Sequence, residues 1–140
     1  MLNDFVSNSH DFTLNKKKIN TDRDPFEIFK QIYLSYDNAF ILESLTGPKE
    51  LSEFSVIGFD PEFTVKCDRG RFHIYRNEKI ISEKKVKDPL LELRRILPTI
   101  NEKKLRYIGG AVGYVSYDAI KFWEQLPTKR ANSMFPLMEF

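Results

Sequence analysis

A succession of short apolar segments separated by turn residues constrains the fold of this chain more than any other feature. Residues 62–67 alternate between apolar and polar side chains, and a period of two is typical of a half-buried β-strand. Turn residues at 69–70 and at Asn77 separate this segment from further apolar runs at 72–76 and 79–82. Tight turns between alternating runs are characteristic of β-hairpins. The pattern therefore predicts an antiparallel meander.

Two helix signals flank the meander. Asp24 and Asp88 are each followed by proline and then by apolar residues at three- and four-residue spacing. Aspartate accepts hydrogen bonds from the free N–H groups of a first turn, and proline at the first helical position loses no hydrogen bond. We expect helices over residues 25–36 and 89–97, and a third, short amphipathic helix over residues 119–126.

The remaining apolar runs add strands to this picture. Residues 39–42 and 54–59 are predicted to be short strands, and residues 107–118 a strand interrupted by glycines. Glycine within a strand marks a bulge or the close approach of another backbone or a ligand. Residues 134–140 begin another apolar run, with no closing turn or cap. The expected fold class is α+β, with a mainly antiparallel β-sheet and a few flanking helices.

Composition excludes several classes of function. Lys+Arg 22 against Asp+Glu 20 leave a net charge of +2, which gives no reason to expect nucleic acid or an anionic membrane as the partner. The single Cys67 excludes an intramolecular disulfide framework, and His10 and His73 belong to no metal-binding or catalytic motif. No apolar run approaches the roughly 20 residues of a membrane span. Neither is there a secretory signal, so a cytoplasmic location is expected.

The end of the predicted strand 39–42 combines groups that can hold an amino acid. Glu43 can pair with a ligand ammonium group, while the Ser44 hydroxyl and nearby backbone N–H groups can bind its carboxylate. The alternative is a solvated loop in which the serine bonds its own backbone.

Three segments, taken in order, resemble the N-terminal region of anthranilate synthase component I. They are ILES at 41–44, FSVIG at 54–58 and GGAVGYVSYD at 109–118. The resemblance covers residues 24–140 and leaves residues 1–23 as a polar N-terminal arm. It implies an N-terminal domain that forms an incomplete half of the family's β-sandwich, with the C-terminal chorismate-binding domain absent. The glycine-rich segment would be a strand packed inside the main sheet, with Tyr114 and Asp118 contacting neighbouring elements.

The resemblance also implies a reaction. Family members are lyases of tryptophan biosynthesis that convert chorismate and ammonia into anthranilate and pyruvate, supported by magnesium. The ammonia comes from glutamine through a partner amidotransferase subunit. The catalytic and metal-binding residues lie in the family's C-terminal portion, so this chain is expected to have no catalytic residue, metal ligand or cofactor of its own, and to be inactive alone.

A regulatory site is implied as well. In the family the segment matching Leu42, Glu43 and Ser44 helps to form the pocket for L-tryptophan, the feedback inhibitor, and Ser55 would lie nearby. This chain has Glu53 where many members have arginine, so a charge pairing made there is lost. Because the rest of the pocket belongs to the C-terminal portion, we expect weak or undetectable tryptophan binding by this chain alone.

Two alternatives stay open at this point. The first is the N-terminal part of aminodeoxychorismate synthase component I, an enzyme of the folate pathway that shares much of the pattern. The second is a stand-alone amino-acid-binding module, which requires a closed core and a complete pocket within the 140 residues. An incomplete sandwich would instead expose apolar faces and tend to self-associate.

Overall fold

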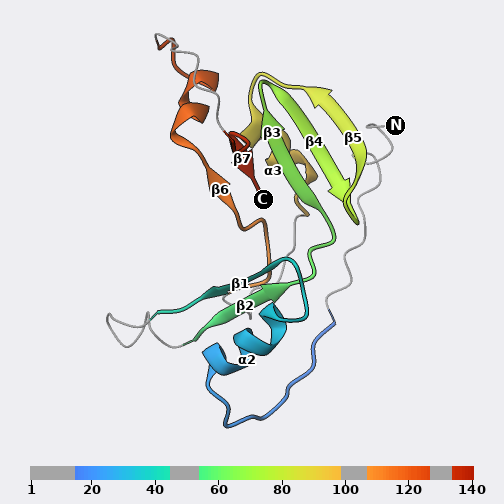
Figure 1. Ribbon diagram of the computed structural model, residues 1–140, viewed down its shortest axis with the longest axis vertical. Coiled ribbons are helices and arrows are strands. Elements are labelled where there is room, and N and C mark those ends of the chain that lie inside the picture. The colour runs from blue at the N-terminus through green and yellow to red at the C-terminus, as the bar shows by residue number, and fades with distance from the viewer. Residues whose placement is uncertain (1–14, 45–53, 99–106, 127–133) are drawn as a thin grey trace. The chain divides into compact units, whose positions relative to one another are not determined.

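The computed structural model describes residues 15–44, 54–98, 107–126 and 134–140. These residues form two compact units: the described residues up to Pro61 make up a smaller one, and those from Glu62 onward a larger one (Figure 1). The predicted boundary between the N-terminal arm and the domain, at residues 23 and 24, stays a prediction.

The smaller unit consists of helix α2 and a two-stranded antiparallel sheet, with α2 packed against both strands. Its elements are α2 (Pro25–Tyr33), β1 (Ala39–Leu42) and β2 (Val56–Phe59). Helix α2 begins as the sequence predicts, because the Asp24 carboxylate accepts a hydrogen bond of 2.8 Å from the Phe26 N–H. It ends three residues before the predicted end, although the Tyr36 N–H still donates to the Ile32 carbonyl in a final turn.

The larger unit is a five-stranded sheet with the strand order β5-β4-β3-β7-β6. All pairs of neighbouring strands are antiparallel. Its elements are β3 (Thr64–Asp68), β4 (Arg71–Arg76), β5 (Lys79–Lys85), α3 (Pro89–Ile96), β6 (Tyr114–Val115), the 3-10 helix η1 (Tyr117–Phe122) and β7 (Met138–Glu139). The predicted meander is therefore confirmed as β3, β4 and β5.

One face of this sheet forms the core. The alternation along β3 buries Val65 and Cys67, and β4 adds its own alternate apolar residues. The buried cluster consists of Val65, Cys67, Phe72, Ile74, Leu93 and Met138. Leu93 belongs to α3, and the ammonium of Lys84 on β5 lies 3.0 Å from the carboxylate of Glu92 on α3. Helix α3 therefore covers the apolar face, behind β3 and β4 in the view of Figure 1.

The opposite face of the same sheet is polar and carries ion pairs between neighbouring strands. The Nζ of Lys66 on β3 lies 2.8 Å from Oε1 of Glu139 on β7. The Nη1 of Arg71 on β4 lies 2.6 Å from Oε1 of Glu83 on β5. A sheet that buries one face and exposes the other to water is a common antiparallel arrangement.

Strand β7 lies within the sheet and has a neighbour on each side. The Leu137 N–H donates to the Cys67 carbonyl at 2.9 Å, and the Ser116 N–H donates to the Leu137 carbonyl at 2.8 Å. The sequence suggested an open strand here, but Met138 is fully buried between β3 and β6.

The glycine-rich segment differs most from the sequence prediction. Instead of a long strand inside the sheet, it contributes only the two-residue β6 at the sheet edge. Gly109 and Gly110 have φ angles of 103° and 147°, which interrupt an extended strand. At Gly113, an added Cβ would collide with the backbone of Glu139 and Phe140. The predicted close approach of another backbone is thus confirmed at this glycine.

The predicted helix over residues 119–126 is instead the 3-10 helix η1, which starts at Tyr117 and ends at Phe122. Helix α3 matches its prediction to within one residue, and the Asp88 carboxylate caps it by accepting from the Leu91 N–H at 3.0 Å. The α+β class with a mainly antiparallel sheet is confirmed. Within the described ranges, no helix has the length and apolar character that a bilayer crossing requires.

Candidate functional site

The residues singled out from the sequence lie together at one end of the β1–β2 hairpin. Leu42 is the last residue of β1 and pairs with Val56, the first residue of β2. Glu43 and Ser44 continue the chain after β1, and Ser55 directly precedes β2. The structure therefore brings all four predicted residues to one hairpin end.

Glu43 and Ser55 are joined by a hydrogen bond. The Ser55 hydroxyl donates to the Glu43 carboxylate, with 3.4 Å between Oγ and Oε1. The β1–β2 register explains this contact, because the next position beyond the Leu42–Val56 pair places residue 43 opposite residue 55. Side chains directly opposite one another in an antiparallel pair lie on the same face.

The ladder geometry also fixes how close these two side chains come. The Asp60 N–H donates to the Asn38 carbonyl at 3.2 Å, and hydrogen-bonded pairs alternate along an antiparallel ladder. Leu42 and Val56 are therefore a hydrogen-bonded pair, and Glu43 and Ser55 occupy the next, non-hydrogen-bonded position. Opposite side chains are closest at such positions.

The four predicted residues do not all share one face of the hairpin. Successive residues of a strand point to opposite faces, so Leu42 and Ser44 face away from Glu43 and Ser55. Glu43 shares its face with Phe59, which contacts the ring of Tyr36. Tyr36 follows α2, and the two ring centroids are 4.8 Å apart.

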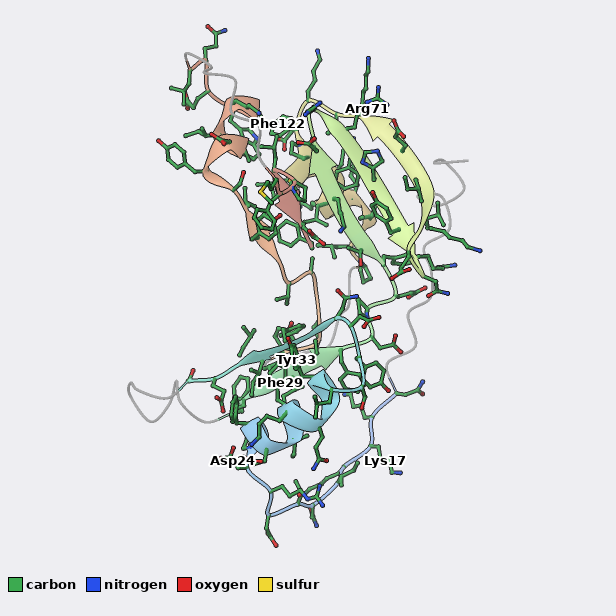
Figure 2. The ribbon with its side chains drawn as sticks, in the orientation of Figure 1. Lys17, Asp24, Phe29, Tyr33, Arg71 and Phe122 are labelled. Carbon is green, nitrogen blue, oxygen red and sulfur yellow. The ribbon has the colours of Figure 1, made fainter. Side chains whose placement is uncertain are left out.

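Helix α2 contributes further aromatic side chains to this unit. Phe29 contacts both Phe26 and Tyr33, with ring centroids 6.5 and 5.8 Å apart. Phe29 is half-buried, whereas Tyr33 is 62% exposed (Figure 2).

The face opposite Glu43 and Ser55 carries Leu42, and continuing the register places Ser44 opposite Phe54 on that face. Leu42 is 47% exposed and Phe54 is 45% exposed, and Ser44 is exposed as well. Two accessible apolar side chains beside a hydroxyl can contact an aromatic ring and a polar group of one small ligand. Sequence reasoning did not include Phe54; the pairing of two alternating strands is the signal that could have found it. Glu53 lies outside the described residues.

The other predicted features belong to the larger unit. The Tyr114 hydroxyl donates to the Pro136 carbonyl at 3.2 Å, which links β6 to the segment before β7. Asp118 is exposed in the first turn of η1. Burial raises the pKa of the Cys67 thiol to about 11, so at neutral pH the thiol is protonated and poorly nucleophilic. Cys67 is thus a core residue, as its place in an alternating strand predicts.

In the ranges that the structure covers, no three side chains of His, Cys, Asp or Glu come close enough together to hold a metal ion. What the hairpin end provides is therefore hydrogen bonding, one carboxylate and apolar contact.

Curated proteins named anthranilate synthase component 1 are similar to this chain. The protein from Methanothermobacter marburgensis is 35% identical over 118 residues, which are 84% of this chain and 25% of that protein. The protein from Saccharolobus solfataricus is 34% identical over 117 residues, 83% of this chain and 24% of that protein. The protein from Leptospira biflexa is 33% identical over 115 residues, which are 82% of this chain and 24% of that protein. No protein family model matches the chain.

The chain spans about a quarter of the length of the curated relatives that it matches. Their agreement confirms the resemblance carried by the three sequence segments, and its extent is consistent with an N-terminal portion. By sequence, the chain belongs to the anthranilate synthase component I family.

Proposed function

We propose that this chain is the N-terminal, regulatory and structural part of a cytoplasmic anthranilate synthase component I. The observation that carries the proposal is the similarity to proteins of that name over more than four fifths of the chain. The whole protein would act in tryptophan biosynthesis, converting chorismate and ammonia into anthranilate and pyruvate. Its partners would be the chorismate-binding C-terminal portion and a glutamine amidotransferase subunit.

The regulatory part of the proposal concerns L-tryptophan as feedback inhibitor. Leu42, Glu43, Ser44 and Ser55 would contribute to its site, and the rest of the site would come from the chorismate-binding portion. The geometry of the hairpin end supports this role, since it combines hydroxyl groups and a carboxylate with exposed apolar side chains. An amino acid with an aromatic ring requires both kinds of contact.

The experiment is a chimera. The matching 118 residues of the Methanothermobacter marburgensis protein are replaced by those of this chain, and anthranilate formation from chorismate, ammonium and magnesium is followed by fluorescence. We expect activity that tryptophan inhibits in the chimera, and no activity from the 140-residue chain alone. Anthranilate formed by the pure chain would contradict the proposal.

A single substitution tests the site within the chimera. Ser44→Arg places a long cation on the face of Leu42, so it should relieve inhibition by tryptophan without removing activity. Ser35→Arg is the matched control, because Ser35 is also exposed but lies in the turn that follows α2. If Ser44→Arg leaves inhibition unchanged, Ser44 is not part of the site.

Two further measurements separate the alternatives. If the full-length protein that carries this chain forms aminodeoxychorismate instead of anthranilate, the chain belongs to a synthase of the folate pathway. If the chain alone binds tryptophan with submicromolar affinity in calorimetry, it is a stand-alone amino-acid-binding module. Tryptophan binding that is weak or undetectable in the chain alone supports the proposed function.

A further inference from the structure

The Glu43 carboxylate has a structural role within the hairpin, because it accepts a hydrogen bond from Ser55. Leu42 and Val56 form the last described pair of the β1–β2 ladder. Beyond this pair, the contact from Ser55 Oγ to Glu43 Oε1 is a side-chain link between the two chain segments. The link lies directly beside Ser44, the next residue along the chain.

The faces of the hairpin separate this link from Ser44. Glu43 and Ser55 share their face with Phe59, whose ring contacts Tyr36 in the segment that follows α2. Leu42 and Ser44 point to the opposite face. A ligand that contacts the face of Leu42 therefore meets Ser44, while the Glu43 carboxylate is on the far side of the strand.

We propose that Glu43 is a positioning residue: by accepting the hydrogen bond from Ser55 it fixes the end of β1 and orients Ser44 toward the amino-acid ligand. Glu43 then forms no ion pair with the ligand ammonium group. This inference rests on the proposed function for its ligand, but its structural half, the coupling of Glu43 to Ser55, is measurable without any ligand.

A positioning role and an ion pair with the ligand require different chemical groups at residue 43. A positioning residue needs an oxygen that accepts from Ser55, and a glutamine side chain supplies one. An ammonium partner needs the negative charge, which glutamine lacks. Glu43→Gln therefore separates the two roles, and Ser55→Thr, which keeps the hydroxyl, is the matching conservative change at the other position.

The first experiment uses the 140-residue chain and measures amide hydrogen exchange by NMR at Leu42 and Val56. We expect Glu43→Ala and Ser55→Ala each to lower protection by about 3- to 10-fold, the range of one net hydrogen bond. The double variant should lose no more than either single variant, because both remove the same link. Glu43→Gln and Ser55→Thr should retain protection.

Glu83→Ala is the control, since Glu83 also accepts a cross-strand hydrogen bond but belongs to the larger unit. It should leave exchange at Leu42 and Val56 unchanged. Losses that add in the double variant, or single variants without effect, would overturn the coupling and with it the proposal.

The second experiment measures tryptophan inhibition in the active chimera. Glu43→Ala and Ser55→Ala should weaken inhibition by the same factor, and Glu43→Gln should stay within about twofold of the parent. Ser55→Thr, which keeps the hydroxyl group, should retain the inhibition of the parent chimera. A Glu43→Gln variant as insensitive as Glu43→Ala would show that the charge is required and would overturn the positioning role.

The two experiments fail separately. An active chimera that tryptophan does not inhibit contradicts the regulatory part of the proposed function, and the exchange measurements still decide whether Glu43 and Ser55 are coupled. Glu43 and Ser55 can prove to be coupled, and the chimera can be inhibited by tryptophan, while inhibition still requires the negative charge of residue 43. That result overturns only the positioning role.

Discussion

The two units of this protein differ in how far they can enclose side chains. Among the described residues, every buried apolar side chain lies in the larger unit, for example Phe72 and Met138. Helix α2 has no buried residue, and β1 and β2 reach only intermediate burial. Both units follow the same local rules of capping and alternation, so the difference comes from the number of packed layers and strands.

A two-stranded hairpin with one short helix cannot surround a side chain on all sides, whereas five strands covered by α3 can. Stability should therefore be concentrated in the larger unit, and local opening should be easier in the smaller one. The candidate ligand surface lies in the smaller unit, where side chains such as Leu42 and Phe54 remain accessible. Regions of low local stability are where regulatory motion is usually found.

The largest expected effect compares one phenylalanine from each unit. Phe72→Ala should lower the free energy of unfolding by about 3–5 kcal/mol, because Phe72 is only 4% exposed and its removal leaves a cavity. Phe59→Ala, at a residue that is 46% exposed, should cost less than about 1.5 kcal/mol. Urea denaturation followed by circular dichroism measures both. Equal losses would remove the contrast between the units.

Replacing glycine by alanine should also cost more free energy of unfolding in the larger unit than in the smaller one, with smaller losses than for phenylalanine. At Gly113 a new Cβ meets the backbone of Glu139 and Phe140, which cannot rotate away, so Gly113→Ala should cost about 2–3 kcal/mol. At Gly58 it meets the ring of Phe40, a side chain that can turn aside, so Gly58→Ala should cost about 1 kcal/mol. Thermal melts rank the two variants. A greater loss for Gly58→Ala would contradict the ranking.

The buried thiol of Cys67 should make the larger unit sensitive to alkaline pH. Burial raises its pKa from 9.0 to about 11, so above pH 9 the unfolded chain loses this proton before the folded one. The contribution to stability is complete below pH 9 and is lost as the pH rises toward 11. The melting temperature should fall less between pH 8 and pH 10 in Cys67→Ala than in the parent protein. An equal fall in both proteins would contradict the assignment of this pH dependence to the Cys67 thiol.

The smallest effect should be a gain in stability at a turn. Glu78 has a φ of 63° and Asp60 a φ of 51°, a region in which glycine is unstrained. Glu78→Gly should raise the free energy of unfolding by about 0.5 kcal/mol. Asp60→Gly should gain less, because aspartate tolerates this conformation better than glutamate. Differential scanning calorimetry resolves the two, and destabilisation by Glu78→Gly would show that its side chain makes a compensating contact.

Much of the local structure could be predicted because it depends on neighbours in sequence. The Asp24 and Asp88 caps and the strand at 39–42 were correct, since capping and alternation act over a few residues. Helix 119–126 was wrong in type, because a six-residue segment can close either kind of turn. The long strand at 107–118 was wrong because Gly109 and Gly110 break the extended conformation.

The candidate site divides in the same way. Its residues, Leu42, Glu43, Ser44 and Ser55, came from the sequence, and the structure places them at one hairpin end. Their roles as tryptophan contacts stay predictions. That Glu43 bonds to Ser55 could not be predicted, because it depends on the register of two strands that residues 43 to 55 separate.

The sequence by itself determined where helices begin, where the meander turns and which family the chain belongs to, because these depend on residue order alone. Tertiary structure decided that β7 lies between β3 and β6, and that the site residues divide between two faces of one hairpin. Those outcomes depend on which strands pair and in which register. Such pairing is fixed only when apolar faces are buried together and backbone hydrogen bonds close across the sheet.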